Sequence, residues 1–309
     1  MSNETPLDQQ VMYVYAALQN LKHGRPINEI ADEIGRSRFA TARMVKRARE
    51  LGLVDVRATV SDPVDVELSA RLAQRYGLRS AVVVVTQAVN EVQMREDIAE
   101  VASRVIVERV KEDDVLGFTP GRTLVLASRR ITELPWADVV QLTGVGWSRL
   151  EDGVEVISNI GRAAKGATHP LYVPMLLDKE ERVILGHPAI QRTLRRFDHI
   201  NQAYLTIGGW PAGTLLADIL AERGELTALA DRGVVGELGT TLLDADGNAV
   251  SGLEDRFIGI SEKQLRAIPS RTAVGGGAAK ERAVLAVLRS GLVDSIITDT
   301  RSAKAALAA

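Results

Sequence analysis

The chain has 309 residues, of which 46% are hydrophobic, 4% aromatic and 25% charged, with a formal net charge of -2. At roughly 150 residues per domain, this length predicts two domains with aliphatic cores. The charge excludes a uniformly basic coat for nucleic acid but allows a local basic patch. The absence of cysteine excludes disulfides, zinc ribbons and thiol catalysis. The N-terminus is polar and the longest apolar runs are strand-length, so we expect no signal peptide and no membrane span, and a cytoplasmic protein.

Residues 8 to 52 have the spacing of helices. Apolar residues recur at intervals of three and four between Val11 and Leu21, which predicts a first helix. Gly24-Arg25-Pro26 interrupts this pattern, and Pro26 is suited to the start of a second helix. The second helix is short and ends at Gly35.

A third helix follows, with Ser37 suited to its N-cap and Gly52 to its end. Its predicted inward face consists of Met44, Val45, Ala48 and Leu51. The segment 53–60 after it reads as extended.

The third helix is strongly basic, because the stretch from Arg36 to Arg49 contains six basic residues and no acid. Two helices joined by a glycine turn, the second of them basic, are typical of a helix-turn-helix, in which the second helix enters the major groove of DNA. A plain solvated basic helix is the alternative. Arg38 and Arg43 are placed to reach bases or phosphates. Lys46, Arg47 and Arg49 are better suited to phosphate contacts. The predicted DNA-binding residues are Arg36, Ser37, Arg38, Phe39, Ala40, Arg43, Lys46 and Arg47.

The pattern changes near Ser61-Asp62-Pro63, so we expect a DNA-binding domain at 1–60 and a second domain at 63–309. Helical stretches such as 92–110 and 280–290 lie between most of a series of short apolar runs. This alternation predicts an α/β fold with a large, mostly parallel sheet covered on both faces. The expected strands are 81–85, 113–118, 137–143, 169–174, 202–208, 271–277 and 294–299.

Glycine-rich loops follow several of these strands, at the edge where α/β sheets bind ligands. Gly121, Arg122 and Thr123 open a helix and could form a phosphate cradle, or simply a tight turn with a helix cap. Glu237 could accept hydrogen bonds from sugar hydroxyls, and Lys280 could pair with an anion; the alternative for each is a solvated surface residue. Asp246-Gly247 predicts a hairpin turn.

The sequence favours a regulator over an enzyme. The four histidines lack the spacing of a metal site, and no nucleophile elbow, Walker loop or dinucleotide fingerprint is present. Glu237 is the only clear loop carboxylate, and no second acid or base stands out beside it. We therefore expect no catalytic residue, no metal and no cofactor. The alternative is a sugar-phosphate isomerase or deaminase-like enzyme with an accessory DNA-binding head, and a third possibility is a head that binds protein.

At both ends the chain resembles the SorC family of bacterial transcriptional regulators. The segment "INEIADEIGRSRFATARMVKRARELGLVDV" resembles the family's DNA-binding head, and "GVVGELGTTLLDADGNAV" with "RFIGISEKQLRAIPSRTAVGGGAAKERAVLAVLRSGLVDSIITDTRSAKAAL" resembles its sugar-binding domain. Pro120, Phe39 and Thr41 depart from the residues common in the family.

The resemblance implies a fold related to glucosamine-6-phosphate deaminase and ribose-5-phosphate isomerase. It also implies a sugar, polyol or sugar-phosphate effector, double-stranded operator DNA as partner, and a homodimer or homotetramer. Matching motifs imply that the effector-binding residues are Thr119, Gly121, Arg122, Thr123, Gly144, Gly146, Gly236, Glu237, Gly276 and Lys280.

Overall fold

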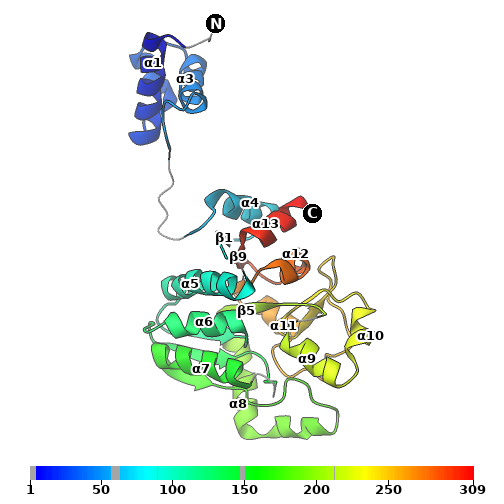
Figure 1. The fold of residues 1–309 in the computed structure, drawn as a ribbon. Helices are drawn as coiled ribbons and strands as arrows, with labels where there is room; N and C mark the ends of the chain where they lie inside the picture. Colours follow the sequence, from blue (N-terminus) through cyan, green and yellow to red (C-terminus); the bar gives the residue numbers. More distant parts are fainter. Residues whose placement is uncertain (1–4, 57–62, 89, 147–149, 212) are drawn as a thin grey trace. The chain divides into compact units, whose positions relative to one another are not determined.

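The computed structural model describes residues 5–56, 63–88, 90–146, 150–211 and 213–309 (Figure 1). The chain divides into two compact units, Met1–Ser61 and Asp62–Ala309, which we call the head and the sheet unit. Two residues of the predicted boundary, Ser61 and Asp62, and the second half of the predicted extended segment 53–60 lie outside the described residues.

The head is helical where the sequence predicts helices. It contains α1 (Leu7–Ala17), continued by a π-helical turn η1 (Leu18–Lys22), then α2 (Ile27–Glu33) and α3 (Arg38–Glu50). Gly35 has a φ of +63°, a left-handed conformation that turns the chain out of α2. The backbone N–H of Ala40 donates to Ser37 Oγ at 3.2 Å, so Ser37 caps α3 as predicted.

The faces packed inside the head differ in part from the predicted ones. Val45 and Ala48 of α3 are buried as expected, but Leu51 is 41% exposed and Thr41 is buried in its stead. On α1 the buried residues are Ala16 and Ala17, whose small side chains let α1 approach α3 closely, and Tyr13 packs against them partly buried. The larger apolar residues that revealed the helix lie largely outside this core.

The described residues of the sheet unit form a nine-stranded sheet with the main path β1-β9-β8-β5-β2-β3-β4. Every neighbouring pair along this path is parallel, so the predicted α/β class is confirmed. An antiparallel hairpin, β6 and β7, extends β5. The strands are β1 (Ser80–Val84), β2 (Asp114–Phe118), β3 (Ala137–Gln141), β4 (Lys165–His169), β5 (Gln202–Gly209), β6 (Gly236–Leu238), β7 (Thr241–Leu243), β8 (Ser270–Val274) and β9 (Ser295–Asp299).

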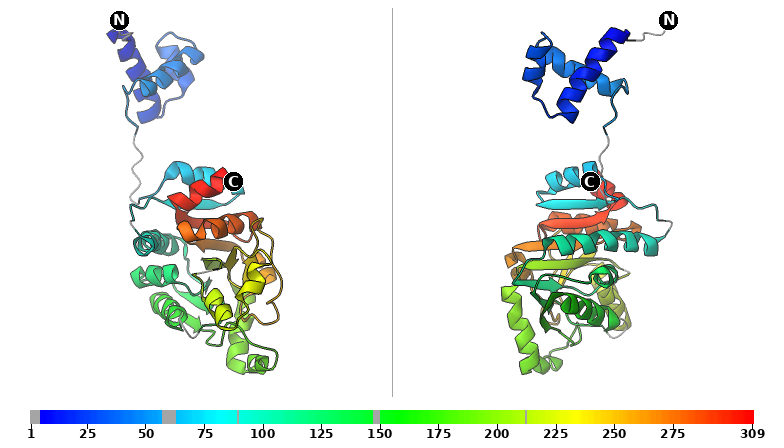
Figure 2. Two further views of the ribbon diagram at one scale, coloured as in Figure 1. Left: turned by 45° about the vertical axis from the view of Figure 1, so that its right-hand side comes forward. Right: turned by 90° about the vertical axis from the view of Figure 1, so that its left-hand side faces the viewer.

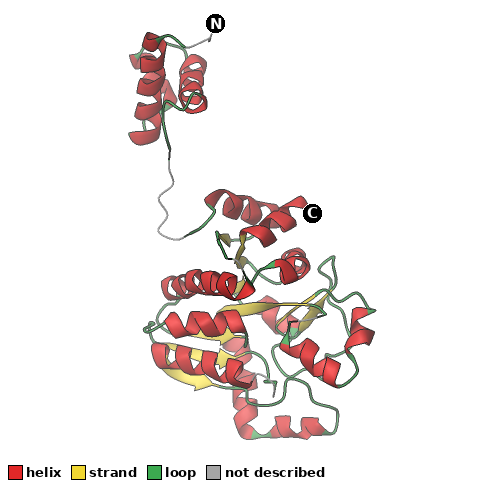
Figure 3. Ribbon diagram, in the orientation of Figure 1, coloured by secondary structure: helices red, strands yellow, loops and turns green. Residues whose placement is uncertain are grey.

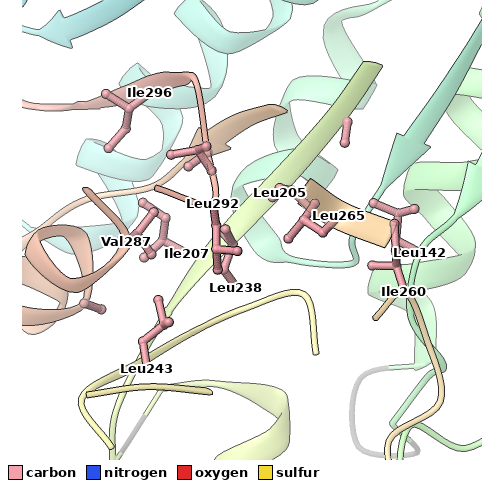
Figure 4. Packing of buried hydrophobic residues seen from close by; sticks show 14 of the residues in the cluster. Leu142, Leu205, Ile207, Leu238, Leu243, Ile260, Leu265, Val287, Leu292 and Ile296 are labelled. Atoms are coloured by element: carbon pink, nitrogen blue, oxygen red, sulfur yellow. The ribbon is translucent and has the colours of Figure 1, made fainter. Parts of the chain in front are cut away.

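Helices cover both faces of the sheet (Figures 2 and 3). Neighbouring strand residues point to opposite faces: Val140 belongs to the apolar cluster with α4, α12 and α13, and Val139 to the cluster with α5, α6 and α7. Figure 4 shows the first of these clusters, with Leu205 and Ile207 of β5 among its side chains. The helices are α4 (Val66–Tyr76), α5 (Glu91–Arg109), α6 (Arg122–Arg130), α7 (Leu150–Ala164), α12 (Glu281–Ser290) and α13 (Thr300–Ala308).

Two predictions on the sheet unit, a strand at 169–174 and a turn at Asp246-Gly247, have different outcomes. The predicted strand 169–174 is wrong: β4 ends at His169, where Pro170 supplies no N–H for a ladder. The tight turn at Asp246-Gly247 is confirmed, with Gly247 at φ +85° between bridged Leu243 and Ala249. The remaining elements are η3 (Glu181–Gly186), α8 (Pro188–Arg196), η4 (Phe197–His199), α9 (Leu215–Glu222), α10 (Leu226–Ala230), α11 (Glu262–Ala267) and η5 (Ala278–Lys280).

The strand order reverses between β2 and β5. From β2 the chain continues to β3 on one side, whereas the next strand of the main path after β5 is β8, on the other side. Such a switch point leaves a crevice at the carboxyl ends of the two strands, where α/β proteins bind ligands. Within the described ranges, no helix is long and apolar enough to cross a membrane.

Candidate functional site: a switch-point cavity and a basic helix

A cavity of about 70 Å³ lies at this reversal, and we call it the switch-point cavity. One water needs roughly 10–15 Å³ measured in this way, so the space suits a small polar molecule. The loop after β2 supplies Thr119 to Thr123, and the end of β5 supplies Thr206 to Gly208. Glu237 of β6 and Lys280 complete this part of the wall.

Glycines make room for the functional side chains. A Cβ on Gly208 would lie 2.4 Å from Cγ of Glu237, and one on Gly121 would lie 2.5 Å from Oγ1 of Thr206. Any larger residue at these positions would displace a lining side chain. The backbone N–H of Thr206 in β5 donates to Thr119 Oγ1 at 2.8 Å, which ties the loop after β2 to β5.

Two threonine hydroxyls in the lining have unused hydrogen-bonding capacity. The hydroxyl oxygens of Thr143 and Thr206 are buried, and neither has a hydrogen-bond partner among the described residues. Buried hydroxyls in native proteins are nearly always paired, so these two groups are candidates to bond a polar ligand.

Among the described residues, the hydrogen bonds to the Glu237 side chain all go to Oε2. Trp210 Nε1 donates to Oε2 at 2.8 Å, and the hydroxyl of Thr214 donates to the same oxygen at 3.4 Å. Burial raises the pKa of Glu237 to about 7, against the lowering effect of these bonds and of Lys280. The carboxyl group therefore changes its charge close to neutral pH.

Lys280 is not a solvated surface lysine. It ends the 3-10 turn η5 just before α12, and its Nζ donates to the backbone carbonyl of Ile207 at 2.6 Å. Burial, together with the nearby cations Arg122 and Arg95, lowers the pKa of Lys280 to about 8. Three cationic side chains therefore meet at one wall, beside the N-terminus of α6.

The predicted effector residues divide into those that line the cavity and those that support it. Lining residues are Thr119, Gly121, Arg122, Thr123, Glu237 and Lys280. Gly276 lies in an adjoining hollow that shares Arg95, Arg122 and Lys280.

Gly144, Gly146 and Gly236 do not line the cavity. A Cβ on Gly144 would meet the backbone carbonyl of Val173 at 2.6 Å, and one on Gly236 would meet Ala283 at 2.6 Å. Gly146 faces the side chain of Leu215 in the same way. These glycines allow close packing of loops and helices around the cavity.

Sequence reasoning missed several lining residues: Arg95, Thr143, Asp152, Thr206 and Thr214. Thr143 lies just beyond the end of β3, so a polar residue after a strand was an available signal there, whereas Thr206 lies within β5 and has no such signal. Arg95 and Asp152 lie inside helices, and only the tertiary fold brings them to the site. Asp152 also supplies the second carboxylate that the sequence did not reveal.

The basic surface of α3 is exposed as predicted. Arg36, Ser37, Arg38, Arg43, Lys46 and Arg47 are exposed, and Ala40 is half-buried. Phe39 is 82% exposed, which is unusual for an aromatic side chain. Lys46 and Arg47 pair with Glu50 at 3.6 and 3.1 Å, whereas Arg36, Arg38 and Arg43 take no part in the ion pairs found among the described residues.

No group of three or more metal-ligating side chains occurs within the described ranges. His169 instead lies 3.8 Å from Asp138, and burial lowers its pKa.

Known proteins resemble the chain over most of its length. A family model described as "Putative sugar-binding domain" matches residues 64–308. The chain is 27% identical over 286 residues to the deoxyribonucleoside regulator of Bacillus subtilis, covering 90% of this chain and 91% of that protein. It is 24% identical over 287 residues to the sorbitol operon regulator of Klebsiella pneumoniae, covering 89% and 91%. The crystal structure of the full-length sorbitol operon regulator SorC from Klebsiella pneumoniae aligns with a TM-score of 0.69 at 22% identity, covering 97% of this chain and 99% of that one, which shows a shared fold.

A helical head followed by an α/β unit that matches a putative sugar-binding domain is the organisation of a transcriptional regulator that responds to a small molecule. The chain belongs to the SorC family of transcriptional regulators, as its sequence motifs predict. The implied relation to glucosamine-6-phosphate deaminase and ribose-5-phosphate isomerase stays a prediction.

Proposed function

We propose that residues 1–60 bind operator DNA through α3, and that residues 63–309 bind a sugar, polyol or sugar phosphate that controls this binding. The protein acts as a homodimer or homotetramer in the cytoplasm, where its DNA is. The family of the chain and the names of its relatives support this function.

The unpaired hydroxyls of Thr143 and Thr206 carry the effector half of the proposal. They lie in one cavity with Glu237, whose Oε1 is not used by Trp210 or Thr214. Hydroxyls and a carboxylate oxygen are partners for a polyhydroxylated ligand. Arg95, Arg122 and Lys280, which line the same cavity, would hold an anionic group, such as a phosphate or a carboxylate.

We infer a regulator without turnover, although Glu237 and Lys280 titrate near neutrality in one cavity. Perturbed pKa values mark functional sites but do not distinguish binding from catalysis. The enzyme alternative predicts isomerase or deaminase turnover of a sugar phosphate that Glu237→Gln abolishes. Observing such turnover well above background would replace this proposal.

A thermal-shift screen of free and phosphorylated sugars and polyols tests the effector half. A ligand at about 100 times its Kd should stabilise the native chain by about 2.7 kcal/mol. The double variant Thr143→Val, Thr206→Val should respond much less to the same compound, because it lacks both hydroxyls. An equal response in wild type and variant would show that the ligand binds elsewhere.

A further inference from the structure

An apolar stripe runs along α1 and its continuation on the surface of the head. Leu7, Val11, Val14, Leu18 and Leu21 follow one another at alternating intervals of four and three residues. Leu7 is 75% exposed, Val11 58%, Leu18 39% and Leu21 40%. This spacing keeps apolar side chains on one face of a helix and is the seam of a helix that pairs with another.

The head does not use this stripe for its own core. Its core cluster consists of Ala16 and Ala17 of α1 with Ile30, Val45 and Ala48, and Ala16 lies on the opposite face of α1 from Leu7. Exposed large apolar residues that form a contiguous line, rather than occurring singly, mark an interaction surface.

The charges at the two ends of the stripe indicate what covers it. Asp8 follows Leu7 at the start of α1, and Lys22 follows Leu21 at the end of η1; both are exposed. If two copies of this segment paired in parallel, the two Asp8 side chains would lie at one end on opposite sides of the seam and the two Lys22 side chains at the other end, so no acid would lie beside a base. An antiparallel pair places Asp8 beside Lys22 of the second copy at both ends, which is the complementary arrangement.

We propose that this stripe docks against the same stripe of a second copy of the chain, with the two helices antiparallel. The proposal rests on the DNA-binding function proposed above, because two heads related by a two-fold axis present two α3 helices to two half-sites. This contact within the head would fix the distance between the two α3 helices, and so the spacing of the two half-sites.

Cysteine cross-linking of the full-length chain tests the pairing, since the natural sequence contains no cysteine. Val14 lies in the middle of the stripe, so Val14→Cys falls near the two-fold axis and should cross-link to itself under mild oxidation. Gln9→Cys is the matched control, because Gln9 is exposed on α1 but lies off the stripe. Val14→Cys should form the disulfide-linked dimer at least about tenfold faster than Gln9→Cys. Two thiols held in contact have a higher effective concentration than the millimolar value expected for two heads that are only tethered.

Orientation is tested with the ends of the stripe. Leu7→Cys alone should cross-link no faster than Gln9→Cys, whereas a mixture of Leu7→Cys and Leu21→Cys chains should give the mixed dimer. Rapid self-linking of Leu7→Cys would overturn the antiparallel arrangement. Equal rates for Val14→Cys and Gln9→Cys would overturn the pairing as a whole.

Binding of the wild-type chain to a labelled random-sequence DNA duplex is measured beside the cross-linking. DNA binding without stripe cross-linking overturns the docking surface and leaves the proposed function intact. Cross-linking without DNA binding overturns the proposed function and leaves the docking surface.

Discussion

The affinity for the effector should depend on pH through the ionisation of Glu237, and replacing Glu237 by glutamine should remove this dependence. Burial raises the pKa of Glu237 to about 7, so the ionised fraction rises from about a tenth at pH 6 to about half at pH 7. If the ionised Oε1 accepts the effector's hydroxyl, affinity should rise about fivefold over this interval. Lys280 has a pKa of about 8 and stays mostly charged throughout it. Above that value Lys280 loses its charge, so affinity for an anionic effector should fall again.

The assay is isothermal titration calorimetry with the best ligand from the thermal-shift screen, at pH 6, pH 7 and pH 9. Glutamine keeps the shape and one acceptor oxygen of Glu237 but does not titrate, so the rise between pH 6 and pH 7 should be absent in Glu237→Gln. A flat wild-type profile, or the same rise in the variant, would refute the assignment of Glu237 as hydroxyl acceptor.

Ionisation of Glu237, which should strengthen effector binding, should lower the stability of the ligand-free protein. A raised pKa means that the folded state favours the protonated carboxyl. This contribution to stability is fully present below the ordinary glutamate pKa of 4.5 and is lost as pH rises through about 7. Stability and effector affinity should therefore respond to pH in opposite directions around neutrality.

Four further substitutions test the DNA-binding helix, its N-cap and the cavity. Arg38→Ala should weaken binding to a DNA site selected by the chain by about 1–3 kcal/mol if it reads a base, whereas Lys46→Ala should weaken binding to all duplexes and flatten the salt dependence; unchanged gel-shift affinities in both would remove α3 from the DNA interface. Ser37→Ala should lower head stability by about 1 kcal/mol through loss of the N-cap, measured by chemical denaturation, and an unaltered midpoint would show that the cap is dispensable. Gly208→Ala should abolish the ligand-induced thermal shift by displacing Glu237; a full shift in this variant would mean that the side chain can move without cost.

Local signals made the order of elements predictable. Ser37, Gly35 and the basic run define α3, and apolar runs separated by helices define the sheet, because these patterns depend on near neighbours in the chain. The cavity was predictable in part: Gly121 in the loop after β2 pointed to it, and the predicted effector residues Glu237 and Lys280 line it.

The rest depended on tertiary structure. Gly144 and Gly236 looked like ligand glycines, but only the packed structure shows Val173 and Ala283 against them. Arg95 lies within α5, and no local pattern distinguishes it from a solvated arginine. Likewise, the spacing of apolar residues predicted α1 as a helix, but it could not show that the face with Ala16 and Ala17 would pack inside the head.

The central claim, that a ligand in the switch-point cavity controls DNA binding, is tested most directly through Lys280. The measurement is the affinity of the full-length chain for its selected DNA site, with and without the ligand, for wild type and Lys280→Ala. Wild-type affinity should change by at least about fivefold when the ligand is added, while Lys280→Ala should keep the ligand-free affinity and lose the response. A variant that responds as fully as wild type would contradict the account, since the anion contact at Lys280 would then have no part in the control of DNA binding.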